Sequence, residues 1–287
     1  FFDEWITTNK NIDYKIGRIK KGKAKDEYQI RLKRKGRMQM PIDLRVISKK
    51  DSTYDYLIPN TWFEKKSEIR NPKSEILPKW FGWDKLEPTY DAVVTIPGGI
   101  KNVIVDPSER LADINMLDNR KHGNVEFRFD SHIYPPASSK KYRLYMQPDL
   151  WWNAYDGFKL GVHLEGNYMF VKHVFSLTVW ADTHLAQGGS RYYLSNEMRK
   201  KAGYFSYNFD YRNAVDKVIP KGTFYFHSQW LDGCEMYKMG LDKGFPQNFS
   251  ADINVKAFTR NSEAWRNYLL YPNEWDAIWT SDKKFNI

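Results

Sequence analysis

The sequence predicts a mainly β protein, in which an antiparallel β-sandwich is followed by an antiparallel β-barrel with longer strands. Between Gln29 and Pro59, apolar residues recur at every second position, which is the period of a strand with one buried face. After Asn119 the alternating segments lengthen to roughly ten residues, the length that a tilted strand needs to cross a membrane. The aromatic content of 16% fits both regions, because aromatic rings suit sheet faces and lipid–water boundaries.

The stretch from Gln29 to Pro59 interleaves long basic residues with apolar ones. We expect a hairpin-like pair of strands at Tyr28–Lys33 and Met38–Ile47. Pro41 is expected at an edge or a bulge, because proline cannot donate to a strand ladder. The apolar residues that alternate through the stretch and share the expected buried face are Ile30, Leu32, Met38, Met40, Ile42, Leu44 and Val46.

The rest of the first region is expected to complete a small sandwich. Phe1–Thr8 places Phe1, Phe2 and Trp5 on one helical face, so residues 1–9 are interpreted as the end of a helix. Pro97-Gly98-Gly99 is expected as a turn between two strands. Residues 10–120 together have the pattern of an antiparallel β-sandwich. Its other expected strands are Ile12–Ile19, Thr53–Ile58, Tyr90–Ile96 and Val103–Val105.

Residues 121–287 are expected to form a barrel-like membrane domain, in which one strand face meets lipid and the other a polar lumen. In Val174–Trp180 the residues Val174, Ser176, Thr178 and Trp180 share one face, while Phe175, Leu177 and Val179 share the other. A soluble β-sandwich with one wet face remains the alternative. The expected segments are Tyr142–Trp152, Phe158–Met169, Val174–Leu185, Gly203–Tyr211, Thr223–Leu231, Phe249–Phe258 and Trp275–Phe285.

Composition narrows the classes of function. The net charge of +10 divides into +6 over residues 1–120 and +4 over the remainder. The charge is therefore spread, and the densest run, Lys20–Lys25, is interpreted as a solvated loop, so we expect no nucleic-acid partner. The single Cys234 allows no disulfide framework. No signal peptide opens the chain, and residue 1 is not Met, so we expect further sequence upstream.

Candidate catalytic and metal-binding residues are few. His163 and Glu165 share a strand face, but an isolated pair of this kind is more often a lumen or surface pair. Asp106, followed by Pro107 and Ser108, is interpreted as a turn at a strand end. Asp113, Asp118 and Asn119 are a candidate calcium site by residue type, but their spacing matches no EF-hand loop. We therefore expect no catalytic, cofactor-binding or metal-ligating residue in this chain, nor any cofactor. The six histidines are scattered: His122, His132, His163, His173, His184 and His227.

An aromatic cluster lies in the irregular, proline-containing stretch Trp62–Pro88. It consists of Trp80, Phe81 and Trp83 around Gly82. Packing over a sheet is its expected role, since buried tryptophan is more often structural than ligand-binding. A glycan-binding module, in which this loop or Trp151-Trp152 stacks on sugar rings, is kept as an alternative.

Several separated pieces of the first region resemble one enzyme family. Phe1–Trp5, Ile12–Ile16 and Ile30–Val46, read with Trp80–Trp83 and Val105–Asn115, resemble zinc aminopeptidases of the aminopeptidase N type, in the gluzincin clan. They resemble the part that follows the catalytic domain, where a helical region gives way to a β-domain. The resemblance implies that a zinc-dependent peptidase domain lies upstream. The His-Glu-x-x-His motif of that family is not found in this chain, so no catalytic residue can be carried over.

A second resemblance begins after the first ends. Asp149–Leu164, with WWNAYDGFKLGVHL, resembles the first strands of bacterial surface-antigen barrels of the Omp85 type. That barrel needs more strands than the sequence provides, so we expect an incomplete barrel.

Together the resemblances imply the C-terminal region of an aminopeptidase-like protein anchored in the outer membrane of a Gram-negative bacterium. Its expected partners are outer-membrane lipid, the peptide substrate of the upstream domain and other outer-membrane proteins. An accessory subunit of an outer-membrane complex, in which the peptidase part is lost or degenerate, is the second interpretation.

Overall fold

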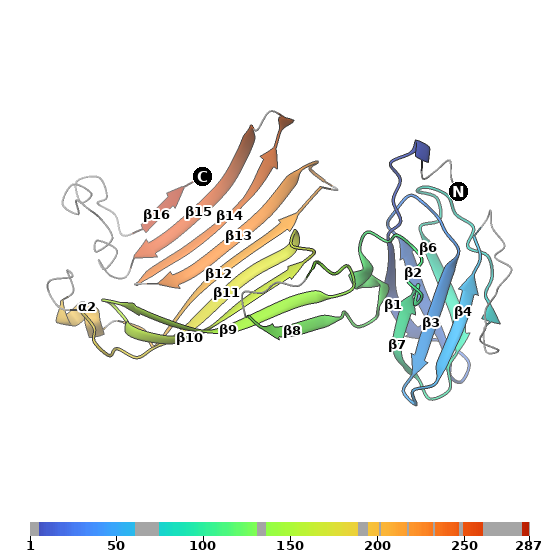
Figure 1. Cartoon of the computed structure of the whole chain (residues 1–287), viewed down its shortest axis with the longest axis horizontal. Coiled ribbons are helices and arrows are strands. Elements are labelled where there is room, and N and C mark those ends of the chain that lie inside the picture. The colour runs from blue at the N-terminus through green and yellow to red at the C-terminus, as the bar shows by residue number, and fades with distance from the viewer. Residues whose placement is uncertain are drawn as a thin grey trace. The chain divides into compact units, whose positions relative to one another are not determined.

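The computed structural model describes residues 6–60, 75–130, 136–188, 195–200, 202–216, 218–231, 233–246, 249–260 and 283–286. The chain is mainly β and divides into two compact units (Figure 1). Unit 1 comprises residues 1–124 with 139–141, and unit 2 comprises residues 125–138 with 142–287. The observed division lies four residues after the boundary expected at residue 120.

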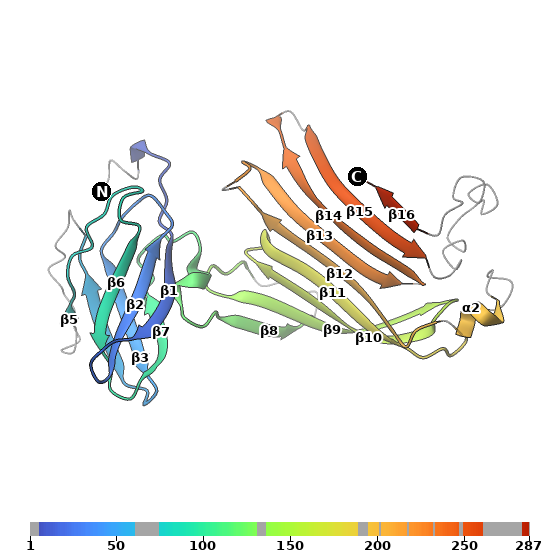
Figure 2. The ribbon, with the colours of Figure 1, turned by 180° about the vertical axis from the view of Figure 1, so that it is seen from behind.

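Unit 1 contains two sheets, which can be followed from both sides in Figures 1 and 2. The three-stranded sheet has the order β1 (Tyr14–Lys21), β2 (Glu27–Arg34) and β6 (Thr89–Thr95). The four-stranded sheet has the order β5 (Glu75–Ile76), β4 (Thr53–Ile58), β3 (Ile42–Ser48) and β7 (Ile100–Val105). All neighbours are antiparallel except the parallel pair β4 and β5. A 3-10 turn, η1 (Met116–Asn119), follows β7.

The two sheets share one apolar core. Ile30 and Leu32 of β2 are 0% and 1% exposed, and Leu44 and Val46 of β3 are both 0% exposed. All four belong to the same core cluster. The period-two pattern therefore does mark a buried face, as predicted. Burial of such a face is the main source of stability in a unit of this size.

The expected hairpin between Tyr28–Lys33 and Met38–Ile47 is wrong. β2 pairs with β1 and β6, whereas β3 pairs with β4 and β7, so the two strands lie in different sheets. The connection crosses from one sheet to the other, with Met38 fully buried and its N–H bonded to the Asn11 carbonyl at 3.1 Å. Alternation continues through the crossing because both strands face the same core, which does not require that they pair.

The turn Pro97-Gly98-Gly99 makes a second crossing of the same kind. Gly98 and Gly99 have φ angles of 82° and 88°, a region that glycine adopts without strain. The turn was predicted, but β6 and β7 belong to different sheets and do not form a hairpin. The sequence predicted this local turn. At both crossings, however, the pairing of the strands depends on packing against the common core.

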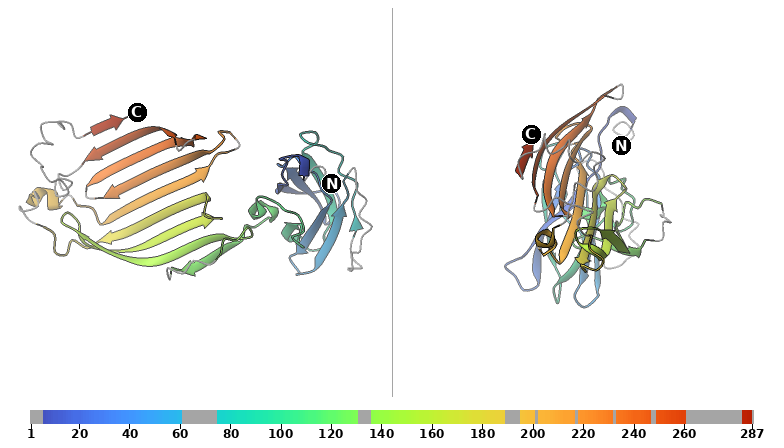
Figure 3. Two further views of the ribbon diagram at one scale, coloured as in Figure 1. Left: turned by 45° about the horizontal axis from the view of Figure 1, so that its top comes forward. Right: turned by 90° about the vertical axis from the view of Figure 1, so that its left-hand side faces the viewer.

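Unit 2 is built on one nine-stranded sheet with consecutive neighbours (Figure 3). All adjacent pairs are antiparallel except β8 and β9, which are parallel. A five-residue helix, α2 (Asn196–Lys200), lies between β11 and β12 in the chain. The strands are β8 (Val125–Phe129), β9 (Tyr142–Asn153), β10 (Gly157–Tyr168), β11 (Lys172–Asp182), β12 (Phe205–Ala214), β13 (Gly222–Leu231), β14 (Cys234–Gly244), β15 (Ser250–Arg260) and β16 (Lys283–Asn286).

The sequence interpretation located most of these strands but missed β8 and β14. Over the described residues the sheet is open, because β8 and β16 lie at its two edges and do not pair with one another. Two expectations fall largely outside the described residues. In the first, the helix at Phe1–Thr8, Ile6 and Thr7 are helical. In the second, the strand at Trp275–Phe285, Lys283–Asn286 forms β16.

Candidate functional site

The sheet of unit 2 has one apolar and one polar face. Cross-strand partners point to the same side, so the register assigns each residue to a face. Leu160 of β10, for example, lies opposite Leu150 of β9 and Ala181 of β11. The residues of this face that are large, apolar and exposed are Val125, Phe127, Phe129, Met146, Leu150, Trp152, Phe158, Leu160, Val162, Phe205, Trp230, Tyr237, Met239, Leu241, Ile253 and Val255.

Aromatic side chains of the apolar face stand near both ends of the strands. Trp152 and Phe158 lie opposite one another beside the β9–β10 turn. Near the other end, Phe175 of β11, Tyr211 of β12 and Phe226 of β13 are matched in register. Aliphatic residues occupy the middle of β10 between these positions. This distribution resembles the aromatic girdles that border the apolar band of a membrane barrel.

The polar face carries the buried charged side chains of the strands. Along β10, Lys159 is 0% exposed while the neighbouring Leu160 is 58% exposed. Arg143 of β9, Thr178 and Asp182 of β11 are also buried on the polar face. A sheet in water shows the opposite arrangement, with apolar residues covered and charged residues solvated.

A buried ionic cluster surrounds Lys159. Its Nζ atom lies 2.5 Å from Asp156 Oδ2 and 3.6 Å from Asp182 Oδ1, and it donates to Ser206 Oγ at 2.9 Å. The ammonium group also lies 5.5 Å and 5.7 Å from the ring centroids of Trp151 and Trp180. Removing one member of such a network would leave uncompensated charge in a buried place.

The turn between β9 and β10 positions this cluster. Asn153 Oδ1 accepts the Asp156 backbone N–H at 2.6 Å, and Asn153 Nδ2 donates to Asp156 Oδ2 at 3.1 Å. Gly157 has a φ of 77°, and a Cβ there would lie 2.3 Å from the Leu185 carbonyl oxygen. Residues 154–156 form this turn. Asn153 orients Asp156, and Asp156 pairs with Lys159. The sequence analysis did not identify Lys159, because it considered only the alternation of this segment.

The histidines of unit 2 bond to single neighbours on different strands. His163 Nδ1 lies 2.7 Å from Thr178 Oγ1, and His227 Nδ1 lies 2.8 Å from Asp210 Oδ1. His163 and Glu165 share the polar face, opposite Thr178 and Ser176. Within the described ranges, no group of three or more His, Cys, Asp or Glu side chains could hold a metal ion. His132 lies outside the described residues.

The acidic residues weighed as a calcium site have structural partners in unit 1. Asp113 Oδ2 accepts the Tyr14 backbone N–H at 2.9 Å and the Asn119 side-chain N–H at 3.0 Å. Burial raises the pKa of Asp113. Asp118 forms an ion pair with Lys35 at 2.5 Å. These contacts tie η1 to the start of β1.

Asp106 is likewise a turn residue. Its carboxylate accepts the backbone N–H groups of Arg110 and Leu111 at 3.1 Å and 2.7 Å. It also accepts the Ser108 hydroxyl at 3.3 Å. The strand-end interpretation fits this geometry, because the carboxylate is occupied by its own loop.

The aromatic loop of unit 1 divides its rings between two roles. Trp80 is 2% exposed and stacks on Tyr90 with centroids 5.4 Å apart, whereas Phe81 and Trp83 are 66% and 56% exposed. Arg34 Nη2 donates to the carbonyl oxygens of Asp84 and Leu86 at 2.9 Å and 2.7 Å, and these bonds stabilise the loop. Burial lowers the pKa of Arg34.

The two tryptophans weighed for glycan stacking in unit 2 do not form a joint platform. Trp151 and Trp152 are consecutive in β9, so they lie on opposite faces. Trp152 Nε1 donates to the Ala186 carbonyl at 3.0 Å, and Trp151 packs against Trp180.

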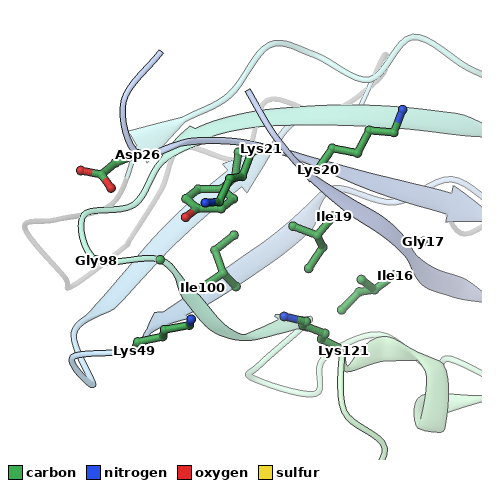
Figure 4. Close-up of a pocket in the computed structure, with 12 residues that line it drawn as sticks. Ile16, Gly17, Ile19, Lys20, Lys21, Asp26, Lys49, Gly98, Ile100 and Lys121 are labelled. Carbon is green, nitrogen blue, oxygen red and sulfur yellow. The ribbon is translucent and has the colours of Figure 1, made fainter. Parts of the chain in front are cut away.

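Unit 1 contains a cavity of about 560 Å³ with a basic rim (Figure 4). Ile16, Ile19 and Ile100 supply apolar walls, and Asp26 is the single acidic residue among those lining it. In Figure 4, Lys49 and Lys121 lie on opposite sides of Ile100 with their ammonium groups turned toward one another. The basic lining residues are Lys20, Lys21, Lys49 and Lys121. Sequence reasoning missed this site because its lysines come from three distant parts of the chain.

Comparison of the chain with protein-family models, with curated proteins and with solved structures found no match.

No helix in the described parts of the chain is both long enough and apolar enough to cross a membrane.

Proposed function

We propose that unit 2 is part of the wall of an outer-membrane β-barrel, and that this chain anchors and positions a zinc aminopeptidase-like domain that precedes it. Unit 1 is then the β-sandwich that follows the catalytic domain in the chain. On this proposal the zinc and the peptide substrate are bound upstream. The observation that carries the membrane assignment is the inverted burial of β10, where Lys159 is buried and Leu160 is exposed.

The exposed apolar face supports a lipid environment on energetic grounds. Soluble monomers rarely expose a continuous apolar surface that spans several strands. In a bilayer the same face would be stabilised by contact with acyl chains. The opposite face, with its buried polar residues, would line the lumen.

Strand length supports the same assignment. β9 and β10 each have 12 residues, which at ~3.3 Å per residue gives about 40 Å. A strand of that length, tilted by about 45°, crosses a hydrocarbon core of ~30 Å. The soluble alternative requires a second layer over the apolar face, and α2 is the one element that the structure describes outside the sheet of unit 2.

The link to a peptidase is supported by the resemblance of Ile30–Val46 and its companion pieces to the aminopeptidase N type. The two-sheet architecture of unit 1 is compatible with the β-domain that this resemblance implies. Sequencing the gene upstream of Phe1 for a His-Glu-x-x-His motif tests this part. A reading frame that starts at Phe1 or encodes an unrelated domain would contradict it.

The membrane assignment is tested by placing arginine on the two faces of one strand. Val162 lies on the apolar face and His163 on the polar face of β10. In phosphatidylcholine vesicles, Val162→Arg is expected to destabilise the folded full-length chain by about 2–4 kcal/mol, the cost of a lipid-facing arginine near the midplane. His163→Arg is the matched control and should cost less. Urea titration in vesicles measures both, and equal effects, or a chain that folds without lipid or detergent, would overturn the assignment.

A further inference from the structure

The proposed anchoring role does not require the cavity of unit 1. This cavity is an open hollow lined by the end of β1, the turn Gly98-Gly99 that crosses between the sheets, and Lys121 in the segment that follows η1. Its volume of about 560 Å³ is in the range typical of small-ligand pockets. Its walls combine apolar side chains with cationic ones, so it is suited to a ligand that has an apolar part and an anionic group.

The lysines at the rim have fixed main-chain positions. The backbone N–H of Lys49 donates to the Gly99 carbonyl at 2.9 Å, and that of Lys121 donates to the Val103 carbonyl at 3.0 Å. A Cβ at Gly99 would lie 3.6 Å from Lys49 Cδ, so the Lys49 stem runs beside the turn. Two lysines from different segments therefore line the same cavity (Figure 4).

Basic side chains outnumber acidic ones at this opening, where Asp26 is the one acidic residue among those lining it. Over the residues that the structure describes, the side chains of Lys21, Lys49 and Lys121 make no ion pair. Lys20 differs, because its positive charge contributes to lowering the pKa of the Asp91 carboxyl. Like charges gathered around a low-dielectric hollow raise the local concentration of anions. The rim therefore favours an anionic group.

The apolar part of the cavity narrows the ligand further. Ile16 and Ile100 are 7% and 6% exposed and belong to the core cluster of unit 1. The cavity therefore borders the core cluster of unit 1. An inorganic anion would leave these walls uncovered, whereas an acyl or alkyl substituent would cover them.

We propose that this cavity binds a phosphate group that carries an apolar chain, with the phosphate between Lys49 and Lys121 and the chain against Ile16, Ile19 and Ile100. Lysine ammonium groups bind phosphate oxygens by charge-assisted hydrogen bonds. Two sources share this chemistry, a soluble alkyl phosphate and the headgroup of a membrane lipid. The lipid source rests on the proposed function.

The experiment uses the full chain in a non-ionic detergent. Binding of dihexanoyl phosphatidic acid is measured by ³¹P NMR line broadening and by calorimetry, with inorganic phosphate and dihexanoyl phosphatidylcholine as comparison ligands. The phosphatidate is expected to bind at least about tenfold more tightly than either. Equal binding of inorganic phosphate would show that the apolar walls are unused and would overturn the proposal, as would equal binding of the phosphatidylcholine.

Matched variants locate the site. Lys49→Gln/Lys121→Gln is expected to weaken phosphatidate binding about tenfold or more, since each lost ammonium removes a charge-assisted bond. Lys23→Gln/Lys25→Gln changes the net charge equally on an exposed turn outside the cavity and should leave binding within about twofold. Lys49→Arg/Lys121→Arg, which keeps the charge, should retain it. Equal losses in the first two pairs, or no binding by the wild-type chain, would overturn the proposal.

A vesicle arm distinguishes the two sources. Wild-type chain and the Lys49→Gln/Lys121→Gln variant are reconstituted in phosphatidylcholine vesicles with and without phosphatidic acid, and hydrogen exchange is followed in unit 1. Protection at residues 16–21 and 98–100 that requires both phosphatidic acid and the two lysines identifies the membrane headgroup as the source. Protection only on addition of the short-chain phosphatidate identifies a soluble ligand. Failure of the chain to insert into vesicles would count against the proposed function alone, because the detergent measurements do not depend on insertion.

Discussion

The two units of this protein share the same alternation of apolar and polar residues, but the surroundings of the apolar residues differ between them. In unit 1 the apolar members of the pattern are covered by a second sheet, and Leu44 is 0% exposed. In unit 2 the apolar members are exposed, as Leu160 is at 58%, while a lysine beside it is fully buried. Period-two alternation therefore establishes that a strand has two different faces, and it leaves open which face is in contact with water. The predictions below test this contrast.

The largest effect is expected at the buried ionic cluster of unit 2. Lys159→Ala removes the cation between Asp156 and Asp182 and leaves their carboxylates without it. We expect a loss of roughly 3–5 kcal/mol in the free energy of unfolding, the range for breaking a buried ion pair. Urea unfolding of the full chain in detergent, followed by hydrogen exchange in unit 2, measures the loss.

Lys238→Ala is the matched control for Lys159→Ala. Lys238 lies on the polar face of β14, half-buried, with its Nζ 5.1 Å from the Tyr225 ring centroid. Because an exposed cation–π contact contributes only about 0.5–1 kcal/mol, a small loss is expected. Similar losses for the two variants would contradict the structural importance of the cluster.

The next effect compares one substitution in the two units. Leu44→Ala in unit 1 removes a side chain with 0% exposure and is expected to cost about 3 kcal/mol, which combines lost transfer energy with the energy of a cavity. On the proposed membrane assignment, Leu160→Ala in unit 2 is expected to cost only about 1–2 kcal/mol in lipid, since fluid acyl chains would fill the space and no cavity would remain. Urea titrations with hydrogen exchange resolved by unit measure both. A larger loss at Leu160 would mean that its side chain is packed against protein.

The smallest effect concerns a surface ion pair of unit 1. Arg31 donates to both carboxylate oxygens of Asp91 at 2.7 Å and 2.6 Å, and the hydrogen bonds and charge of Arg31 lower the pKa of Asp91. A lowered folded-state pKa contributes stability above the unfolded pKa of about 3.9, and that stability is lost as pH falls through the folded value. Both side chains are about one-third exposed, so solvent screens the pair.

We therefore expect Asp91→Asn to lower the urea midpoint of unit 1 slightly at pH 7. The difference from the wild type should shrink as pH falls toward 3, because Asp91 is then increasingly protonated in the wild-type protein. Chemical denaturation at the two pH values measures the difference. A difference that grows on acidification would contradict the assigned sign.

Much of the strand content could be predicted from the sequence, because alternation is a local property. Thr53–Ile58 was located to the residue, and β9–β13 and β15 of unit 2 were located within a few residues. β14 was missed because Lys238, Gly240 and Asp242 make its polar face look like a loop. That face is paired and half-buried only because β13 and β15 lie on either side of it.

Pairing and sites could be predicted much less well. The hairpin expected between Tyr28–Lys33 and Met38–Ile47 is not formed. Alternation shows that both strands face the core, but it does not show whether they pair in one sheet. The Lys159 cluster joins residues 156, 159, 182 and 206, and only the register of β10, β11 and β12 brings them together. The lysines at the cavity rim are likewise gathered by the crossing between two sheets. Such contacts depend on distance in space, for which a single sequence has no direct signal.

The sequence by itself determined that this protein is mainly β, that its texture changes after Asn119, and that each strand has an apolar and a polar side. Only the tertiary structure decided which strands pair, and that the apolar side is covered in unit 1 and exposed in unit 2. The physical reason is that side-chain alternation follows from the geometry of a single strand, whereas burial depends on what other parts of the chain are packed against it.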